Sequence, residues 1–166
     1  MIFRDLRADE IECRVQSVKA YGLVLLLYKN ARCDMNILDE TVGAESWQRE
    51  HYECKGNLFC RVGIKCEDVK HNGWEWVWKS DCGTESNTEA QKGEASDSFK
   101  RACFNWGIGR ELYTTPFIWI PGERCNINNG KCYDKFSVEK IIIENKRITA
   151  IAIRNDTKKE RAFVWQ

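Results

Sequence analysis

Three strand-length runs in the middle of the chain, divided by two short turn sequences, constrain the fold most strongly. The runs are rich in aromatic and β-branched residues, which favour strands, and cover residues 44–54, 58–66 and 74–79. Between them stand Lys55-Gly56-Asn57 and His71-Asn72-Gly73, and both Gly and Asn tolerate the positive φ angles of tight turns. The pattern predicts a three-stranded antiparallel meander.

The third run carries an alternating set of tryptophans. Trp74, Trp76 and Trp78 are separated by single residues. Because successive side chains of a strand point to opposite faces, the three indoles share one face of the predicted sheet. We favour core packing beneath a helix as the interpretation, since aromatic stripes are more often buried than functional. A platform on which nucleic-acid bases stack is the alternative.

A long amphipathic helix is predicted after the meander. Apolar residues recur at i, i+4, i+7, i+8 and i+11, at Ala95, Phe99, Ala102, Cys103 and Trp106. Asn87 or Thr88 can cap the start of this helix, and Gly107 and Gly109 end it, because glycine adopts the left-handed conformation without a Cβ clash. The apolar stripe is expected to pack on the sheet.

The remaining segments complete the predicted fold class, which is α+β. Further elements are expected as a helix or irregular arm over 5–17, a buried strand over 21–28, a short helix over 32–42, and a C-terminal hairpin of 137–144 and 147–154 with a possible third strand over 161–165. The whole is predicted as an antiparallel meander packed against a long α-helix, with a C-terminal β-hairpin. We expect a single domain over residues 1–166, with a core at about 10–120 and the hairpin extension at about 131–166.

Composition excludes several classes of protein. The longest apolar run, 22–28, is too short to span a bilayer, so no membrane partner is expected. Nine cysteines stand singly, without a C-x-x-C pair, which argues against a zinc site and for reduced thiols in the cytoplasm. No metal or other cofactor is expected. A net charge of +1 shows no general basic excess, so any nucleic-acid binding requires a local basic stripe.

Two neighbouring motifs resemble a known family. Ser96-Asp97-Ser98-Phe99-Lys100-Arg101-Ala102 lies on the predicted long helix, and Gly107-Ile108-Gly109-Arg110-Glu111-Leu112-Tyr113 follows it. Together they are similar to the signature of phage and bacterial single-strand annealing proteins of the Rad52-like superfamily. The resemblance covers roughly residues 10–120, and its specific motifs lie in the helix region.

The resemblance implies a non-enzymatic protein that binds single-stranded DNA and anneals complementary strands without ATP, in homologous recombination and DNA repair. It further implies a homo-oligomeric ring or filament around a basic groove, an origin in a phage, and work in the cytoplasm of a bacterial host. A single-strand-binding protein or an exonuclease is the expected protein partner. The chain accordingly lacks a G-x-x-x-x-G-K-[ST] phosphate loop.

The same resemblance assigns the DNA-binding residues. Lys100 and Arg101 match the basic pair on the family's long helix, Lys92 matches a basic position two turns earlier, and Arg14 matches an arginine of the N-terminal arm. Arg110 is a further candidate, although an arginine just past a helix end can also bind the last carbonyls. For all of these residues a solvated helix face or a surface ion pair is the alternative. At position 104, where some members of the family carry a further basic residue, this chain has Phe104.

Three other functions remain open. His51 and Glu53, which share a strand face with Arg49, and the acidic Asp34, Asp39 and Glu40 could contribute to a nuclease-like metal site. A non-catalytic protein-interaction module is the second alternative, with the apolar residues 117–120 between Pro116 and Pro121 as its interface. Binding of RNA is the third.

Overall fold

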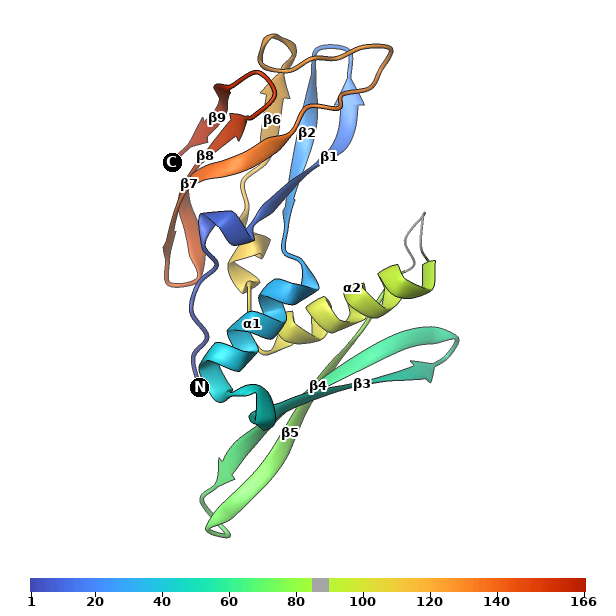
Figure 1. The fold of residues 1–166 in the computed structure, drawn as a ribbon, viewed down its shortest axis with the longest axis vertical. Coiled ribbons are helices and arrows are strands. Elements are labelled where there is room, and N and C mark those ends of the chain that lie inside the picture. Colours follow the sequence, from blue (N-terminus) through green and yellow to red (C-terminus); the bar gives the residue numbers. More distant parts are fainter. Residues whose placement is uncertain (85–89) are drawn as a thin grey trace. The chain divides into compact units, whose positions relative to one another are not determined.

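The computed structural model describes residues 1–84 and 90–166, which form two compact units (Figure 1). Unit 1 comprises residues 1–4 and 30–109, and unit 2 comprises residues 5–29 and 110–166. Each unit contains its own antiparallel sheet. The division into a core and a C-terminal extension of one domain stays a prediction.

Unit 1 is a three-stranded sheet with helices on one side. Its elements are α1 (Ala31–Val42), the 3-10 helix η2 (Ala44–Ser46), β3 (Trp47–Cys54), β4 (Asn57–Asp68), β5 (Gly73–Cys82) and α2 (Ala90–Asn105). The strands follow one another in the order β3-β4-β5. Helix α2 lies against β4 and β5, and α1 contacts α2 (Figure 1).

The ends of the helices follow from local chemistry. The Asn30 side chain accepts a hydrogen bond from the Cys33 backbone N–H at 2.9 Å and so caps α1, which ends at Gly43 with a φ of +88°. Two glycines with positive φ, Gly107 and Gly109, follow α2, as the sequence predicts. The predicted cap of α2 at Asn87 or Thr88 lies outside the described residues.

The core of unit 1 lies between α2 and one face of β4. Cys60, Val62 and Ile64 alternate along β4 and are fully buried, together with Phe99 on the facing side of α2. Burial raises the pKa of the Cys60 thiol to about 11, so this cysteine stays protonated and serves as a small apolar residue. The Trp106 indole N–H donates to the Val62 carbonyl at 2.9 Å, which ties the chain after the helix to the same strand.

Unit 2 is built on a six-stranded antiparallel sheet in the order β6-β2-β1-β7-β8-β9. Its strands are β1 (Glu12–Lys19), β2 (Gly22–Tyr28), β6 (Ile118–Pro121), β7 (Phe136–Glu144), β8 (Arg147–Asn155) and β9 (Glu160–Trp165), and its 3-10 helices are η1 (Ala8–Glu10), η3 (Arg110–Thr114) and η4 (Gly122–Arg124). The end strands β6 and β9 contact each other, which nearly closes the sheet into a barrel.

The predicted fold class, one meander packed against a long helix, is wrong. The described chain is mostly β, with nine strands in two sheets and two α-helices of 12 and 16 residues. The second half of the predicted helix or arm at 5–17, from Glu12 on, belongs to β1, because pairing with the leucine-rich β2 overrides a helical spacing of apolar residues. The predicted C-terminal hairpin belongs to the larger sheet, since β7 pairs with β1 at Glu12 and Ser137.

The apolar residues 117–120 pack mainly inside unit 2. Ile118 and Ile120 are buried in β6, which pairs with β2, whereas Phe117 just before this strand is 73% exposed. The surface considered for protein interaction is therefore reduced to one prominent aromatic side chain.

Neither α1 nor α2, the α-helices of the described residues, has the length and apolar character needed to cross a membrane.

Candidate nucleic-acid interface

Three of the five predicted DNA-binding residues lie on α2 in unit 1. Lys92 and Arg101 are exposed and Lys100 is half-buried. Lys100 and Arg101 are adjacent and therefore diverge by about 100° around the helix axis, and Lys92 lies about two turns earlier. The structure thus places the three cations on one element, along which they spread rather than forming a single cluster.

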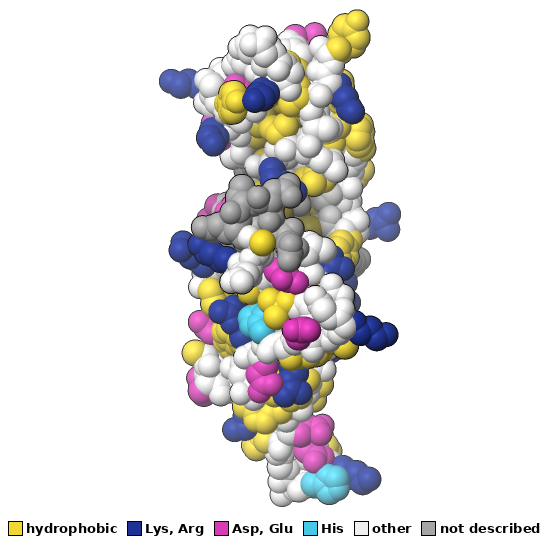
Figure 2. Space-filling model, turned by 90° about the vertical axis from the view of Figure 1, so that its right-hand side faces the viewer, with side chains coloured by type: hydrophobic (Ala, Val, Ile, Leu, Met, Phe, Trp, Pro, Cys, Tyr) yellow, Lys and Arg dark blue, Asp and Glu magenta, His cyan; other side chains and the backbone are white. Residues whose placement is uncertain are grey.

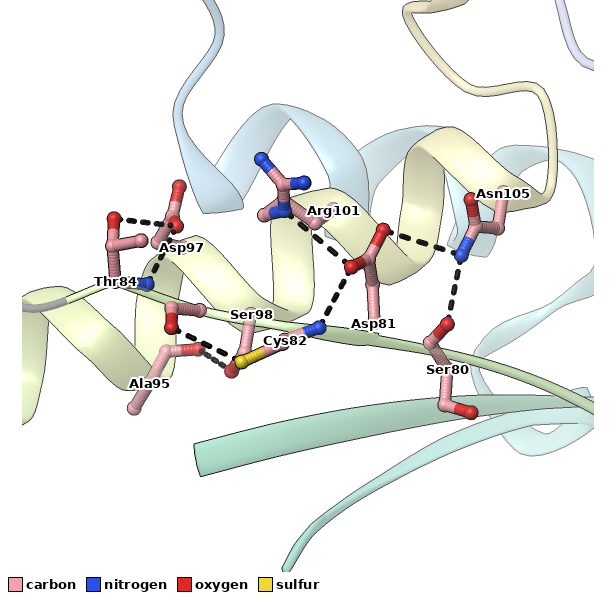
Figure 3. A network of polar contacts seen from close by, with 10 residues as sticks. Ser80, Asp81, Cys82, Thr84, Ala95, Asp97, Ser98, Arg101 and Asn105 are labelled. Carbon is pink, nitrogen blue, oxygen red and sulfur yellow. Dashed lines mark hydrogen bonds and ion pairs between the residues drawn. The ribbon is translucent and has the colours of Figure 1, made fainter. Parts of the chain in front are cut away.

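The acidic residues of α2 have structural partners within unit 1. A Glu94 carboxylate oxygen accepts the Leu58 backbone N–H at 3.0 Å. A carboxylate oxygen of Asp97 accepts the Thr84 backbone N–H at 3.0 Å and the Thr84 hydroxyl at 3.2 Å (Figure 3). Both carboxylates therefore have partners within unit 1, and the three cations of α2 exceed its two acids by one charge.

Arg101 takes part in a polar network between α2 and the end of β5 (Figure 3). Its Nε lies 3.5 Å from a carboxylate oxygen of Asp81, and the Asn105 amide donates to the other Asp81 oxygen at 3.4 Å and to the Ser80 carbonyl at 2.8 Å. The Asp81 carboxylate also accepts the Cys82 backbone N–H at 2.7 Å. The Arg101–Asp81 contact is long and half-exposed, so a phosphate can compete for this guanidinium.

The substitution Asp81→Asn is expected to strengthen binding of single-stranded DNA by about two- to fivefold, because it removes the anion that competes for Arg101. This range corresponds to ~0.4–1 kcal/mol, which lies within the contribution of an exposed ion pair. Fluorescence anisotropy with a labelled oligonucleotide measures the affinity. Asp97→Asn is the matched control, since it removes the same charge from the same region, where Asp97 binds Thr84 and not Arg101. An equal gain in both variants would attribute the effect to net charge and contradict the competition.

Most of the motif on α2 has a structural role. Phe99 is fully buried, its ring lies 6.0 Å from that of Trp47, and the Arg49 guanidinium lies over it at 4.7 Å. Gly83 just after β5 approaches α2 so closely that a Cβ there would overlap the Glu94 carbonyl oxygen and lie 2.8 Å from the Ser98 backbone nitrogen. Phe99 within the motif and Gly83 outside it therefore fix the helix on the sheet, and Lys100 and Arg101 are the cations of the motif.

Arg14 and Arg110 belong to unit 2 and lie on different elements. Arg14 is an exposed residue of β1 opposite Leu26 of β2, and Arg110 is the exposed first residue of η3. Next to Arg110, the fully buried Glu111 accepts the Leu6 backbone N–H at 2.7 Å and lies 3.7 Å from the Lys146 ammonium group. This part of the second motif is structural, like Phe99 in the first.

The face of the unit 1 sheet opposite α2 is rich in aromatic side chains. The antiparallel register places Gly63 opposite Trp78, Lys65 opposite Trp76 and Glu67 opposite Trp74. A Cβ on Gly63 would lie 2.8 Å from the Trp78 ring, so this indole covers the strand backbone. We call this surface the tryptophan face, and its members are Tyr52, Phe59, Arg61, Lys65, Trp74, Trp76 and Trp78.

Core packing of the three tryptophans beneath a helix, the favoured interpretation, is wrong. Helix α2 covers the face that carries Cys60, Val62 and Ile64, and the indoles lie on the other face, where Trp74 is 66% and Trp76 39% exposed. Arg61 and Lys65 share this face and were not among the predicted site residues. The turn at residues 69–72 sets the register that puts them beside the indoles, so turn length and alternation could have identified them.

Three residues of the nuclease-like alternative have structural partners. His51 Nε2 lies 3.1 Å from the Ala95 carbonyl oxygen, Asp39 accepts the Trp47 indole N–H at 2.6 Å, and Glu40 pairs with Arg4 at 2.8 Å. Within the described ranges, no three His, Cys, Asp or Glu residues gather as metal ligands.

On the surface drawn in Figure 2, Lys and Arg side chains are interspersed with Asp and Glu, in keeping with a net charge of +1.

The chain matches the model of a known protein family. The family model described as "Rad52/22 family double-strand break repair protein" matches residues 3–129, which is more than half of the chain. The matched range includes both motifs and every predicted DNA-binding residue. No curated protein and no solved structure matches the chain significantly.

Proposed function

The chain belongs to the Rad52/22 family of double-strand break repair proteins, and from this premise we propose that it binds single-stranded DNA and anneals complementary strands without ATP. Membership places the protein in DNA recombination and repair. The observation that carries the finer proposal is the set of three cations along α2, Lys92, Lys100 and Arg101, in a helix whose acids Glu94 and Asp97 bind backbone N–H groups.

Cations along a helix act on the nucleic-acid backbone and not on its sequence. Lys and Arg neutralise phosphates and release counterions, so affinity falls as the salt concentration rises and does not depend on base order. Bases that are not held by these contacts stay available for pairing with a second strand. Annealing then draws its free energy from base pairing, and we propose neither a catalytic step nor a nucleotide cofactor.

Assembly and cellular context complete the proposal. We propose that several copies form a ring or filament, because a continuous groove holds a longer strand than one short helix can. The likeness of the motifs to phage annealing proteins supports an origin in a phage and action in the bacterial cytoplasm. A single-strand-binding protein or an exonuclease is the proposed partner, and its contact surface on this chain is not assigned.

Annealing of two complementary fluorescent oligonucleotides without nucleotide tests the proposal. The wild type is expected to accelerate annealing. Lys100→Ala/Arg101→Ala is expected to bind DNA about 25-fold more weakly at ~0.1 M salt, because each lost phosphate contact on a single strand lowers the salt slope by ~0.7 and two contacts are lost. A shallower salt dependence should accompany this loss. Binding and annealing are measured at two salt concentrations.

The control Lys70→Ala/Arg147→Ala removes two exposed cations elsewhere and should change affinity little. If wild type remains folded but neither binds nor anneals the strands, the proposed function fails and the protein-interaction module becomes the better hypothesis. Competition with RNA oligonucleotides of the same sequence separates the third alternative, since an RNA-binding protein should prefer them.

A further inference from the structure

We propose that the tryptophan face of unit 1 is a second contact for single-stranded DNA, on which bases stack against Trp74 and Trp76. The proposal rests on the proposed function and extends it, since the α2 cations bind phosphates whereas this face binds bases. The two surfaces lie on opposite faces of the same sheet, because α2 covers the face that carries Val62 and the indoles occupy the other.

The indoles are accessible at the positions that stacking requires. Trp74 is 66% and Trp76 39% exposed, while Trp78 is half-buried and lies over Gly63. Large aromatic rings left in contact with water lose the free energy that burial would supply, and a base of any identity has a π-face that can cover them. Trp78 thus forms the floor of the surface, and the exposed rings of Trp74 and Trp76 are available to stack with a nucleobase.

Two cations are placed against the rings of this surface. The Arg61 guanidinium lies 4.2 Å from the centroid of Trp78, and the Lys65 ammonium lies 5.6 Å from that of Trp74. These contacts restrict the orientations of the side chains and bring positive charge beside the stacking area. Combined aromatic and cationic side chains are characteristic of surfaces that hold single strands.

Acidic side chains on the same face balance these cations. Glu50 pairs with Arg61 at 2.8 Å, and Glu67 stands opposite Trp74 in the register. The local charge is therefore close to zero, so the contribution of this face should come from stacking and depend little on salt. The α2 cations should behave in the opposite way, which separates the two surfaces experimentally.

The spacing of the indoles fits an extended strand. Positions i and i+2 of β5 are about 6.8 Å apart, and the ring centroids of Trp76 and Trp78 are 6.3 Å apart. This is about twice the ~3.4 Å separation of successive nucleotides in a B-form strand. Bases on neighbouring indoles would consequently be unstacked from each other, as in a single strand and unlike in a duplex.

The charged residues among the rings favour a nucleic acid over a flat protein partner. A protein that covered this face would desolvate Glu50, Arg61, Lys65 and Glu67, and charged residues are depleted at the cores of protein interfaces. A single strand instead places bases on the rings and leaves its backbone, and the charges beside it, in water. Charge and aromatic spacing thus point to the same ligand.

Binding of two ligands to the full chain tests the proposal. The ligands are an oligothymidylate and an abasic deoxyribose-phosphate oligomer of the same length and charge. Trp74→Ala/Trp76→Ala is expected to lose at least about tenfold in affinity for the oligothymidylate and little for the abasic oligomer, because only the former has bases to stack. The salt slope should stay that of the wild type. Trp165→Ala, which removes a tryptophan of similar exposure (38%) from unit 2, should match the wild type.

Aromatic rescue and assembly complete the design. Trp74→Phe/Trp76→Phe should recover most of the affinity, since phenylalanine retains a stacking ring. Equal losses for both ligands, or unchanged affinity together with an altered sedimentation coefficient, would overturn the proposal, the latter by revealing a contact between copies of the chain. If wild type binds in a salt-dependent way that needs Lys100 and Arg101 but not the tryptophans, only this inference fails. A wild type that binds neither ligand overturns the proposed function and this inference with it.

Discussion

Phe99→Ala is expected to lower the free energy of unfolding by about 3–5 kcal/mol, the range for truncation of a buried aromatic residue. Phe99 is 0% exposed, and the substitution removes its contacts with Trp47 and with the Arg49 guanidinium. The cavity would open between α2 and the sheet of unit 1, which cannot fully collapse because the helix is also held by Glu94 and Asp97. Urea denaturation followed by circular dichroism measures the loss.

Phe117→Ala is the matched control for this substitution. Phe117 is 73% exposed, so the same change of side chain should cost less than about 0.5 kcal/mol. A loss below ~1 kcal/mol for Phe99→Ala would mean that α2 does not depend on this side chain for its position. The presence of Phe99 in the motif on α2 would then need an explanation other than packing.

Gly83→Ala is expected to destabilise the protein by about 1–3 kcal/mol, as overpacking of a close contact does. The new Cβ would overlap the Glu94 carbonyl oxygen and lie 2.8 Å from the Ser98 nitrogen and 2.9 Å from the Ser98 Cβ. Two of these three atoms belong to the backbone of α2, so the helix itself must move away from the end of β5. Thermal unfolding and urea titration measure the change.

Gly73→Ala, at the other end of β5, supplies the comparison. The nearest atom to a Cβ at Gly73 is the His71 carbonyl oxygen at 3.9 Å, and its φ is not in the left-handed region, so stability should change by less than about 0.5 kcal/mol. Similar losses in both variants would show that the effect comes from strand propensity and not from contact with α2. Because Gly83→Ala also shifts α2, it should weaken DNA binding as well as stability, whereas Lys100→Ala/Arg101→Ala should leave the fold intact.

Local patterns predicted much of unit 1 and little of the arrangement of unit 2. Turn sequences and alternation located β3, β4 and β5, and the apolar stripe with its terminal glycines located α2. In unit 2, strands far apart in the chain pair with one another: β2 pairs with β6 and β1 with β7. No local pattern specifies such partners, because pairing over long separations depends on which edges and apolar faces remain after the local elements have formed.

The candidate site shows the same division. The motif identified Lys100 and Arg101, and the structure adds the Asp81 carboxylate near Arg101, a contact between segments 20 residues apart. The interpretation of the tryptophans failed because alternation assigns residues to a common face without saying which face the helix covers. The apolar residues Cys60, Val62 and Ile64 mark the face that the helix covers, and the turn register places the indoles on the other face.

The sequence by itself determined the strands and helix of unit 1, the residues that share each strand face, and membership of the Rad52/22 family through motifs in residues 3–129. Periodicity, turn chemistry and motif identity are properties of neighbouring residues, so they can be read along the chain. Only the tertiary structure decided that the chain is mostly β, that β7–β9 join the sheet of β1 and β2, and that the indoles face away from α2. These features depend on which surfaces bury each other, and burial is decided by contacts between distant segments.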